Sequence, residues 1–384
     1  MEASENGAQD RGQHRLMDAA LPSSQPTQYK QEKPDVIRAR ELVLRHGWNS
    51  TSFQIVNPGI KRWFSTAGDA VAGYVPAAGV RVAVGAPVCP SDRLAAVIEE
   101  FESDALECRQ SLCYFAAETR LESLVSGRGD HSKFLIGAQP AWDPHGWPEI
   151  VKHNRSLRAQ LNRARNKGVI VTEWPASQAW EDEHLSNVLE RWLSSKGLPP
   201  LHFMVETHTL ARLENRRVFV AECPQGVVGF VVLSPVAERH GWLCEQFPHV
   251  PGAPNGTVEL MIDTAMRSVA HDGCRYVTLG LSPLSRRADV PPVPQPLWLN
   301  AVLAWVRKHG QRFYNFDGLD AFKAKLKPER WEPVYAVVNK PEVTPRDLYA
   351  IASVFSGNAP VKLMAGAIYK AARTELRWMK RRLS

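Results

Sequence analysis

The chain has 384 residues, of which 44% are hydrophobic and 23% are charged. This is the composition of a globular protein, so a wholly disordered or fibrous chain is excluded, and the length favours two domains. The formal net charge of +7 suits contact with the phosphates of nucleic acid or anionic lipid. The charge alone does not distinguish a protein with such a partner from a basic enzyme that has no polyanionic partner.

The cysteines and the apolar segments indicate the compartment and the cofactors. The cysteines form no C-x-x-C pair and match no zinc site or disulfide framework, which predicts a reduced compartment and no bound metal. They are Cys89, Cys108, Cys113, Cys223, Cys244 and Cys274. No stretch approaches the roughly 18 apolar residues of a membrane-spanning helix, and the amino terminus lacks a signal core. We therefore expect a cytoplasmic protein with no transmembrane segment, either soluble or peripheral at the inner face of the membrane.

The first half of the chain alternates helical periods with short strand-like runs. Residues 1–33 are polar and show no apolar period, which predicts a disordered leader. Glycine and proline separate the runs that follow. The pattern predicts helices over 34–46, 92–107 (capped by Ser91) and 119–125, and strands over 52–56, 71–76, 80–84, 112–117 and 133–137.

The second half repeats this order of elements. The pattern predicts helices over 178–194, 258–271 (capped by Thr257), 296–309 and 319–326, and strands over 218–223, 227–233, 242–247, 276–280 and 334–338. Helices that flank a mixed sheet give an α/β (α+β) fold, and the order is that of the GCN5-related N-acetyltransferase fold. The sequence therefore predicts two tandem acetyltransferase-like lobes, an N-terminal lobe over 34–147 and a C-terminal catalytic lobe over 169–340.

A basic segment, 148–168, joins the two predicted lobes. Pro148 and Gly168 mark the ends of a predicted helix, and no acidic residue lies between Glu149 and Glu173. Arginine-rich surfaces of one sign bind phosphate, which predicts a contact with tRNA or lipid head groups. The alternative is a solvated helix whose arginines pair with carboxylates elsewhere. The predicted tRNA-binding residues are Lys152, Arg155, Arg158, Arg163, Arg165 and Lys167.

The candidate active site begins with two acidic residues of the second lobe. Glu245 lies on a predicted apolar strand, where a charge is costly unless it is paired or used. A Pro-Asn-Gly turn at 254–256 leads into the helix capped by Thr257, whose free backbone N–H groups can bind an anion or a polarised carbonyl. Glu259 lies in the first turn of that helix. We expect both acids to face this mouth, although an acid in a first helical turn also has a purely structural role.

Two later stretches add further candidates. Gly280 follows a buried strand and allows close approach of the backbone, and Lys323 and Lys325 can bind anions. The neighbouring aromatic residues are expected in the core.

The segments APNGTVELM (253–261), LGLSPL (279–284) and FYNFDGLDAFKAKLKPERWEP (313–333) together resemble the catalytic domain of the lysylphosphatidylglycerol synthase (multiple peptide resistance factor) family. RSLRAQLNRARNKG (155–168) resembles the helix that joins that family's two lobes. The resemblance extends over roughly 35–340. The family usually carries an N-terminal membrane flippase, which is not found in this sequence, so we expect a stand-alone form.

The resemblance implies aminoacyl-tRNA-dependent transfer of an aminoacyl group to a membrane-lipid hydroxyl, in phosphatidylglycerol or a similar lipid. Aminoacyl-tRNA is then the co-substrate and no cofactor is needed. The two acids are candidates to hold the α-ammonium group, and the lysines or the helix N–H groups to stabilise the oxyanion. No Ser-His-Asp or Cys-His pattern predicts a covalent nucleophile. The predicted catalytic set is Glu245, Asn255, Gly256, Glu259, Lys323 and Lys325.

The chain departs from the family pattern at several positions. Glu245-Gln246-Phe247-Pro248 stands where Asp-Leu-Met-Arg is common, Glu259 replaces an aspartate, and Asp317 occupies a position that is often basic. Because both acidic side chains are longer than those of the family, the identity of the transferred amino acid stays open. The absence of the arginine and the acidic residue at 317 also leave open how the tRNA end is bound. The lipid and the oligomeric state also stay open.

Other functions compete with this interpretation. An acetyl-CoA-dependent N-acyltransferase would need the pyrophosphate loop Q/R-x-x-G-x-G/A, which we do not find; the corresponding segment is 285–290, SRRADV. A catalytically degenerate protein that only binds tRNA or lipid is a second alternative. A transferase with a peptide or protein amine as acceptor is a third.

The segment 341–384 is predicted to be a basic amphipathic tail. Apolar residues share one face of a predicted helix over 361–384, and basic residues lie mostly off that face, the pattern of a helix in an anionic membrane surface. Packing of the same face on the second lobe is the alternative. The predicted membrane contacts are Lys370, Arg373, Arg377, Lys380 and Arg381.

Overall fold

The computed structural model describes residues 33–180, 182–195, 203–204, 209–291, 295–310 and 315–356. The α-helices within these residues are α2 (Pro34–His46), α3 (Leu94–Glu107), α4 (Thr119–Val125), α5 (Trp147–His153), α6 (Arg155–Asn166), α7 (Ala176–Ala179), α8 (Glu183–Ser195), α9 (Thr257–His271), α10 (Leu297–Gly310), α11 (Phe316–Lys325) and α12 (Pro345–Phe355). The strands are β1 (Lys61–Phe64), β2 (Val71–Ala77), β3 (Val80–Val84), β4 (Ser111–Ala117), β5 (Ser132–Trp142), β6 (Ile170–Trp174), β7 (Arg217–Cys223), β8 (Gly226–Val236), β9 (Gly241–Cys244), β10 (Tyr276–Thr278), β11 (Ser282–Pro283) and β12 (Arg330–Val338).

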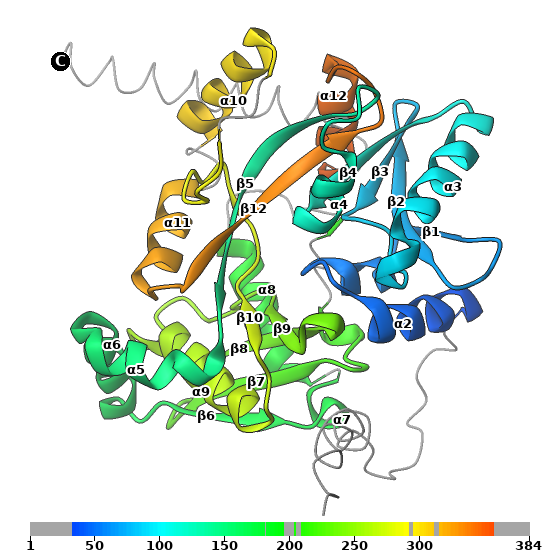
Figure 1. Ribbon diagram of the computed structural model, residues 1–384. Helices are drawn as coiled ribbons and strands as arrows, with labels where there is room; N and C mark the ends of the chain where they lie inside the picture. The colour runs from blue at the N-terminus through cyan, green and yellow to red at the C-terminus, as the bar shows by residue number, and fades with distance from the viewer. Residues whose placement is uncertain are drawn as a thin grey trace, which may run out of the picture. The chain divides into compact units, whose positions relative to one another are not determined.

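The strands form one mixed sheet that runs through both halves of the chain (Figure 1). The order along the sheet is β1-β2-β3-β4-β12-β5-β10-β9-β8-β7-β6, with β11 paired to β5. Each half contains antiparallel strands followed by one parallel pair, β3 with β4 in the first half and β9 with β10 in the second. The two halves therefore repeat the same local topology.

The two halves exchange their last strands. β12, from the end of the second half, pairs with β4 of the first half, and β5, from the end of the first half, pairs with β10 of the second. β5 and β12 also pair with each other from Arg330 opposite Ala141 to Val338 opposite Ser132. The pairing crosses the predicted boundary between 34–147 and 169–340, so that division stays a prediction.

Helices cover both faces of the sheet. In the first half the alternate residues of β12 point to opposite sides, where Val334 and Ala336 join the core under α2 and α12, and Tyr335 and Val337 join the core under α3 and α4. In the second half α6 and α9 cover one face of β7 and β8, and α8 covers the other. A sheet buried on both faces explains why its strands are continuous apolar runs.

Most predicted elements are present, but several details of the prediction were wrong. Residues 52–56 form a short 3-10 helix instead of a strand, because their backbone N–H groups bond three residues back, as from Gln54 to Thr51. β1 and β6 were not predicted, since neither carries a long apolar run. The helix predicted over 178–194 is divided into α7 and α8.

Three of the predicted caps and ends also differ. The hydroxyl of Thr257 donates to the carbonyl of Pro254, and Gly256, at φ +94°, is the residue that precedes α9. Ser91 opens a 3-10 turn ahead of α3 instead of capping it. β9 ends at Cys244, so Glu245 follows the strand, although its N–H still bonds to Val232.

The basic helix predicted over 148–168 is two helices, α5 and α6. Asn154 separates them at φ −102° and ψ 90°, and its side-chain oxygen caps α6 by accepting a bond from the N–H of Leu157. Its amide nitrogen donates to the carbonyl of Lys325 at 2.8 Å. An asparagine that caps a helix and also bonds a distant carbonyl favours a break that the helical period does not reveal.

Three predictions concern the ends of the chain and the membrane. Apart from Lys33, the leader predicted over 1–33 lies outside the described residues. Beyond α12, so does the amphipathic tail, with its predicted membrane contacts Lys370, Arg373, Arg377, Lys380 and Arg381. Within the described ranges no helix has the length and apolar character needed to cross a bilayer.

Replacement of Asn154 by alanine should lower the free energy of unfolding by about 1–2 kcal/mol, because it removes the cap of α6 and leaves the Lys325 carbonyl without its donor. Asn166→Ala is the matched control, since Asn166 is exposed at the other end of α6. Urea unfolding of both variants measures the difference. Equal losses of stability would contradict a specific role for Asn154.

Candidate functional site

Glu259 and Lys325 form a pair at the start of α9. Glu259 is in the first turn of that helix with its side chain 11% exposed, and its carboxylate lies 3.4 Å from the ammonium group of Lys325 at the end of α11. The side chain of Lys325 is a third exposed, so one member of the pair faces solvent. The structure therefore brings together two of the residues predicted to be catalytic.

The same place is in close contact with the basic helix α6. A Cβ at Gly256 would lie 2.0 Å from the backbone carbonyl oxygen of Gln160, so only glycine lets α9 begin this close to α6. Asn154, at the start of α6, bonds the carbonyl of Lys325. The starts of α6 and α9 and the end of α11 thus meet beside the Glu259–Lys325 pair. Gly256 has a packing role here, and Asn255 is exposed in the turn before it.

Lys323 has different surroundings, although only one residue separates it from Lys325. Its side chain is buried, and its ammonium group donates to the carbonyls of Gly280 and Leu281 at 2.8 and 2.9 Å. Burial lowers the pKa of Lys323 to about 7, against the opposing charge of Asp320. A lysine near half-protonation at neutral pH can accept and return a proton.

Glu245 is buried in a pair with Arg216. Its carboxylate lies 3.3 Å from the Arg216 guanidinium and accepts a bond from the hydroxyl of Ser234, and both charged side chains are at most 5% exposed. Arg216 also donates to the side chain of Asn57, in the first half of the chain, at 3.1 Å. The pairing with Arg216 thus offsets the free-energy cost of burying the Glu245 carboxylate. A role of Glu245 at the α-ammonium group stays a prediction.

The basic residues of the connecting segment are exposed, and only some of them have partners. Arg165 pairs with the buried Asp263 at 2.9 Å, Lys152 with Glu149 at 3.2 Å, and Arg158 donates to the carbonyl of Val151. Three further cations show no acidic partner within the described part of the chain: Arg155, Arg163 and Lys167. The buried face of α6 consists of apolar residues, as the helical period predicts. A surface with unneutralised cations is able to bind phosphate.

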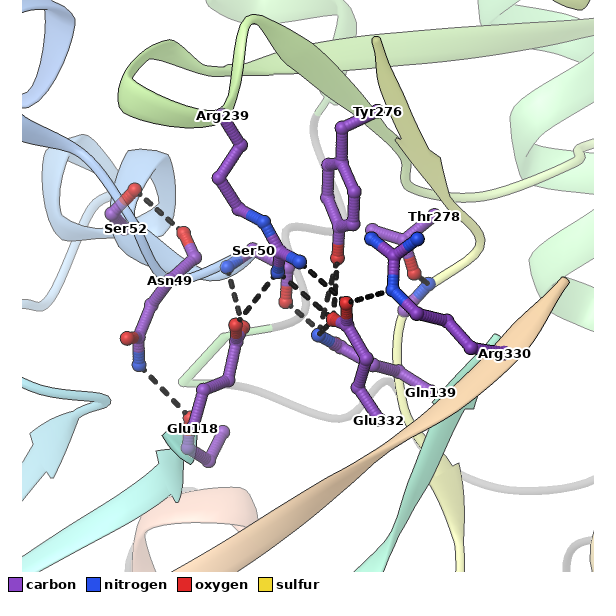
Figure 2. Close-up of polar contacts among 12 residues, drawn as sticks. Asn49, Ser50, Ser52, Glu118, Gln139, Arg239, Tyr276, Thr278, Arg330 and Glu332 are labelled. Atoms are coloured by element: carbon purple, nitrogen blue, oxygen red, sulfur yellow. Dashed lines mark hydrogen bonds and ion pairs between the residues drawn. The ribbon is translucent and has the colours of Figure 1, made fainter. Parts of the chain in front are cut away.

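The sequence analysis missed a buried polar cluster where the two halves meet (Figure 2). Arg239 lies between two carboxylates, 3.1 Å from Glu118 and 2.9 Å from Glu332. Its guanidinium also lies over the ring of Tyr276, 3.6 Å from the centroid. Gln139 and Tyr276 each donate to Glu332 at 3.1 Å. These residues come from β5, β10, β12, the end of β4 and the β8–β9 connection, so no local spacing could reveal the cluster.

The cluster is held by compensation of buried charge. Burial opposes ionisation of Glu332, but the hydrogen bonds and charge of Arg239 outweigh it and hold the pKa of Glu332 at about 2. Burial raises the pKa of Glu118 above its ordinary value, against the opposing charge of Arg239. The backbone N–H of Ser50 donates to the Glu118 carboxylate at 2.6 Å, which connects the loop after α2 to the cluster. Arg239 thus links residues from both halves.

Comparison with known proteins places the chain in a family. A family model described as "Phosphatidylglycerol lysyltransferase, C-terminal" matches residues 40–338. The chain belongs to this family. The resemblance seen in the motifs is thereby confirmed.

Its relatives are longer proteins. The phosphatidylglycerol lysyltransferase of Bacillus subtilis (strain 168) is 25% identical over 313 residues, which cover 80% of this chain and 36% of that protein. The chain spans about a third of the length of the curated relatives it matches.

Solved structures of this family share the fold. The C-terminal domain of a protein described as a putative lysylphosphatidylglycerol synthetase, from Agrobacterium fabrum, has a TM-score of 0.71 at 23% identity and covers 85% of this chain and 98% of that one. L-PGS from Bacillus licheniformis has a TM-score of 0.69 at 20% identity, covering 85% and 99%. With the mixed sheet, these similarities confirm the α/β (α+β) fold class, while the division into two acetyltransferase-like lobes stays a prediction.

Replacement of Arg239 by leucine should destabilise this lysyltransferase-family chain by about 3–5 kcal/mol, because it takes the shared cation away from two buried carboxylates. The matched control is Arg330→Ala, which removes a half-exposed arginine from Glu332 and should cost less than about 1 kcal/mol. Chemical denaturation followed by tryptophan fluorescence measures both. Similar losses in the free energy of unfolding for the two variants would show that the buried Arg239 contributes no more to stability than the half-exposed Arg330.

Proposed function

We propose that the chain transfers an aminoacyl group from aminoacyl-tRNA to a hydroxyl of phosphatidylglycerol or a similar lipid. The observation that supports this most is the contact between α6 and the start of α9. Through this contact, the helix that carries the exposed cations without acidic partners in the described part of the chain lies against the helix that carries Glu259 of the carboxylate–lysine pair. Family membership supports the same reaction, which would take place where tRNA and membrane meet, at the inner face of the membrane.

The donor is held at two points in this proposal. The cations of α6 bind phosphates near the acceptor end of the tRNA. Glu259 receives the α-ammonium group, since its contact with Lys325 is long and that lysine is partly exposed. Lys325 is then free to stabilise the oxyanion that develops on the ester carbonyl. The N–H of Thr257 already bonds Pro254, so it is a poor candidate for that task.

Lys323 is the proposed general base. A neutral lysine has two N–H bonds, and both can be directed at the carbonyls of Gly280 and Leu281, which leaves the nitrogen lone pair for the lipid hydroxyl. The hydroxyl oxygen bonds to the aminoacyl carbonyl carbon as its proton passes to Lys323. The ester bond to the terminal ribose then breaks, and the ribose oxygen takes the proton back. No covalent enzyme intermediate is required.

The purified chain should convert lysyl-tRNA and phosphatidylglycerol into an aminoacylated lipid, detected by thin-layer chromatography of radiolabelled lysine. The rate should rise as the pH passes upward through about 7, because Lys323 must lose its proton to act as the base. Lys323→Met should lower the rate roughly 10²–10⁴-fold and abolish this rise. Lys327→Met, at an exposed neighbouring position, is the control. Lack of a lipid product with lysyl-tRNA and with other aminoacyl-tRNAs would refute the proposal.

Simultaneous replacement of Arg155, Arg163 and Lys167 by alanine should weaken tRNA binding by about tenfold or more and reduce its salt dependence. Removing one cation that binds a phosphate lowers the slope of log K against log salt by roughly 0.7–0.9. The matched control replaces three other exposed cations and so removes the same charge: Arg45, Lys61 and Arg109. Filter binding of tRNA over a salt series tests both triple variants. If both variants lose the same tRNA affinity, the cations of this segment do not form a specific tRNA-binding surface.

A further inference from the structure

A buried aspartate on α9 is shared by two arginines. The side chain of Asp263 is only 1% exposed, and its two carboxylate oxygens accept bonds from Arg165 of α6 at 2.9 Å and from Arg267 of α9 at 3.0 Å. The indole N–H of Trp147, at the start of α5, donates to the same carboxylate at 2.9 Å. Since α6 and α9 pack against each other (Figure 1), the carboxylate holds together two guanidinium groups from neighbouring helices. Arg165 and Arg267 are called the arginine pair below.

The charges of this group do not cancel. One arginine is enough to compensate one buried carboxylate, so the second leaves a positive charge in excess. Each guanidinium uses a single nitrogen in the pairing, Nη2 of Arg165 and Nε of Arg267, and neither side chain has another partner among the described residues. The two arginine side chains are 49% and 47% exposed, whereas the aspartate is enclosed. The pairing therefore orients the arginines and leaves their other N–H donors for a ligand.

The surroundings of the arginine pair favour RNA over a membrane as the source of a phosphate. The sequence of α6 contains no acidic residue, and the exposed Glu149 of α5 is paired with Lys152. None of the large exposed hydrophobic residues lies on α5, α6 or α9, all of whose residues the structure describes. These helices therefore lack the apolar side chains with which a surface helix enters a bilayer. Two guanidinium groups held together suit the oxygens of a phosphodiester.

We propose that Arg165 and Arg267 together bind one phosphate of an RNA backbone, and that Asp263 is the residue that positions them. Each guanidinium keeps its bond to Asp263 and donates its outward N–H groups to the phosphate oxygens. Asp263 itself does not touch the RNA. The sequence analysis predicted Arg165 from its charge alone, whereas Arg267 lies on a different helix, far along the chain, and only the shared carboxylate reveals it.

The position of the arginine pair relates it to the candidate active site, and this step rests on the proposed function. Glu259 and Arg267 both lie on α9, roughly 12 Å apart along the helix axis at 1.5 Å per residue. A phosphate held by the arginine pair would therefore lie within a few nucleotides of a terminal ribose placed at Glu259. The arginine pair would thus fix the direction from which the acceptor end of a tRNA approaches.

Lysine substitutions test the geometry without changing the charge. Arg165→Lys and Arg267→Lys are made singly and together in the full chain, and filter binding measures the affinity for a tRNA transcript. Each single variant should bind about three- to tenfold more weakly, because an ammonium group lacks the guanidinium fork. The double variant should lose little more than either single variant, since both arginines hold one phosphate. The matched control carries Arg45→Lys and Arg109→Lys, two exposed arginines elsewhere, and should bind as the wild type does.

Asp263→Asn separates positioning from charge. The substitution removes a negative charge, so a purely electrostatic attraction predicts tighter tRNA binding. The proposal predicts weaker binding, because the two arginines lose the carboxylate that holds them together and repel each other. Tighter or unchanged binding would overturn the proposal, as would lysine variants that bind like the wild type or a wild type that does not bind tRNA. Circular dichroism and thermal unfolding check the fold, and if Asp263→Asn does not fold, the lysine variants decide.

Two further measurements identify the partner and separate this inference from the proposed function. In sedimentation with phosphatidylglycerol vesicles, the lysine double variant should behave as the wild type does; a loss of vesicle binding with unchanged tRNA binding would show a lipid phosphate instead and overturn the proposal. In the transfer assay the double variant should raise the KM for lysyl-tRNA more than it lowers kcat. If the wild type makes no aminoacylated lipid, the proposed function fails, while tRNA binding still decides on the arginine pair. If the wild type makes the lipid but the variants bind tRNA normally, only this inference fails.

Discussion

The antiparallel pairing of β5 with β12 is the constraint on which the rest of the structure depends. Each strand ends one half of the chain, and each continues the sheet of the other half, β12 beside β4 and β5 beside β10. Pairing between distant segments carries a loop-closure cost, and the burial of apolar side chains on both faces of the sheet helps to offset it. The alternating residues of β12 meet that condition, since they enter two different cores.

The exchange also explains why charges are buried at the centre. Glu118 follows β4, Glu332 lies on β12, Gln139 on β5 and Tyr276 on β10, so the four central strands bring polar side chains to one place. Arg239 compensates both carboxylates there. A buried ion pair contributes little net stability compared with a hydrophobic core, but a carboxylate without its arginine is strongly unfavourable. The contacts of Arg239 with Glu118 and Glu332 therefore matter most as compensation of buried charge.

The candidate site is built from the connections around this sheet. α11 leads directly into β12, so the position of that strand determines where Lys323 and Lys325 lie. Lys325 then meets Glu259 at the start of α9, and Asn154 joins the start of α6 to the same point. A segment of charged helix that would be solvated by itself thus becomes one side of the candidate site. Lys323 and Arg307 both donate to carbonyls of the segment that follows β10, so α11 and α10 are bonded to the same segment.

The sequence by itself determined the fold class, the family and most of the elements, because apolar periods, turns and ordered motifs are local properties of the chain. It also placed Glu259, Lys323, Lys325 and the cations of α6 among the candidates. Only the tertiary structure decided which of them meet: Lys325 contacts Glu259, whereas Lys323 is buried against two carbonyls and Glu245 is paired with Arg216. The exchange of β5 and β12, the break at Asn154 and the Arg239 cluster depend on contacts between residues far apart in the chain. Spacing along a sequence carries no record of such contacts, since they arise when sheet and helices pack together.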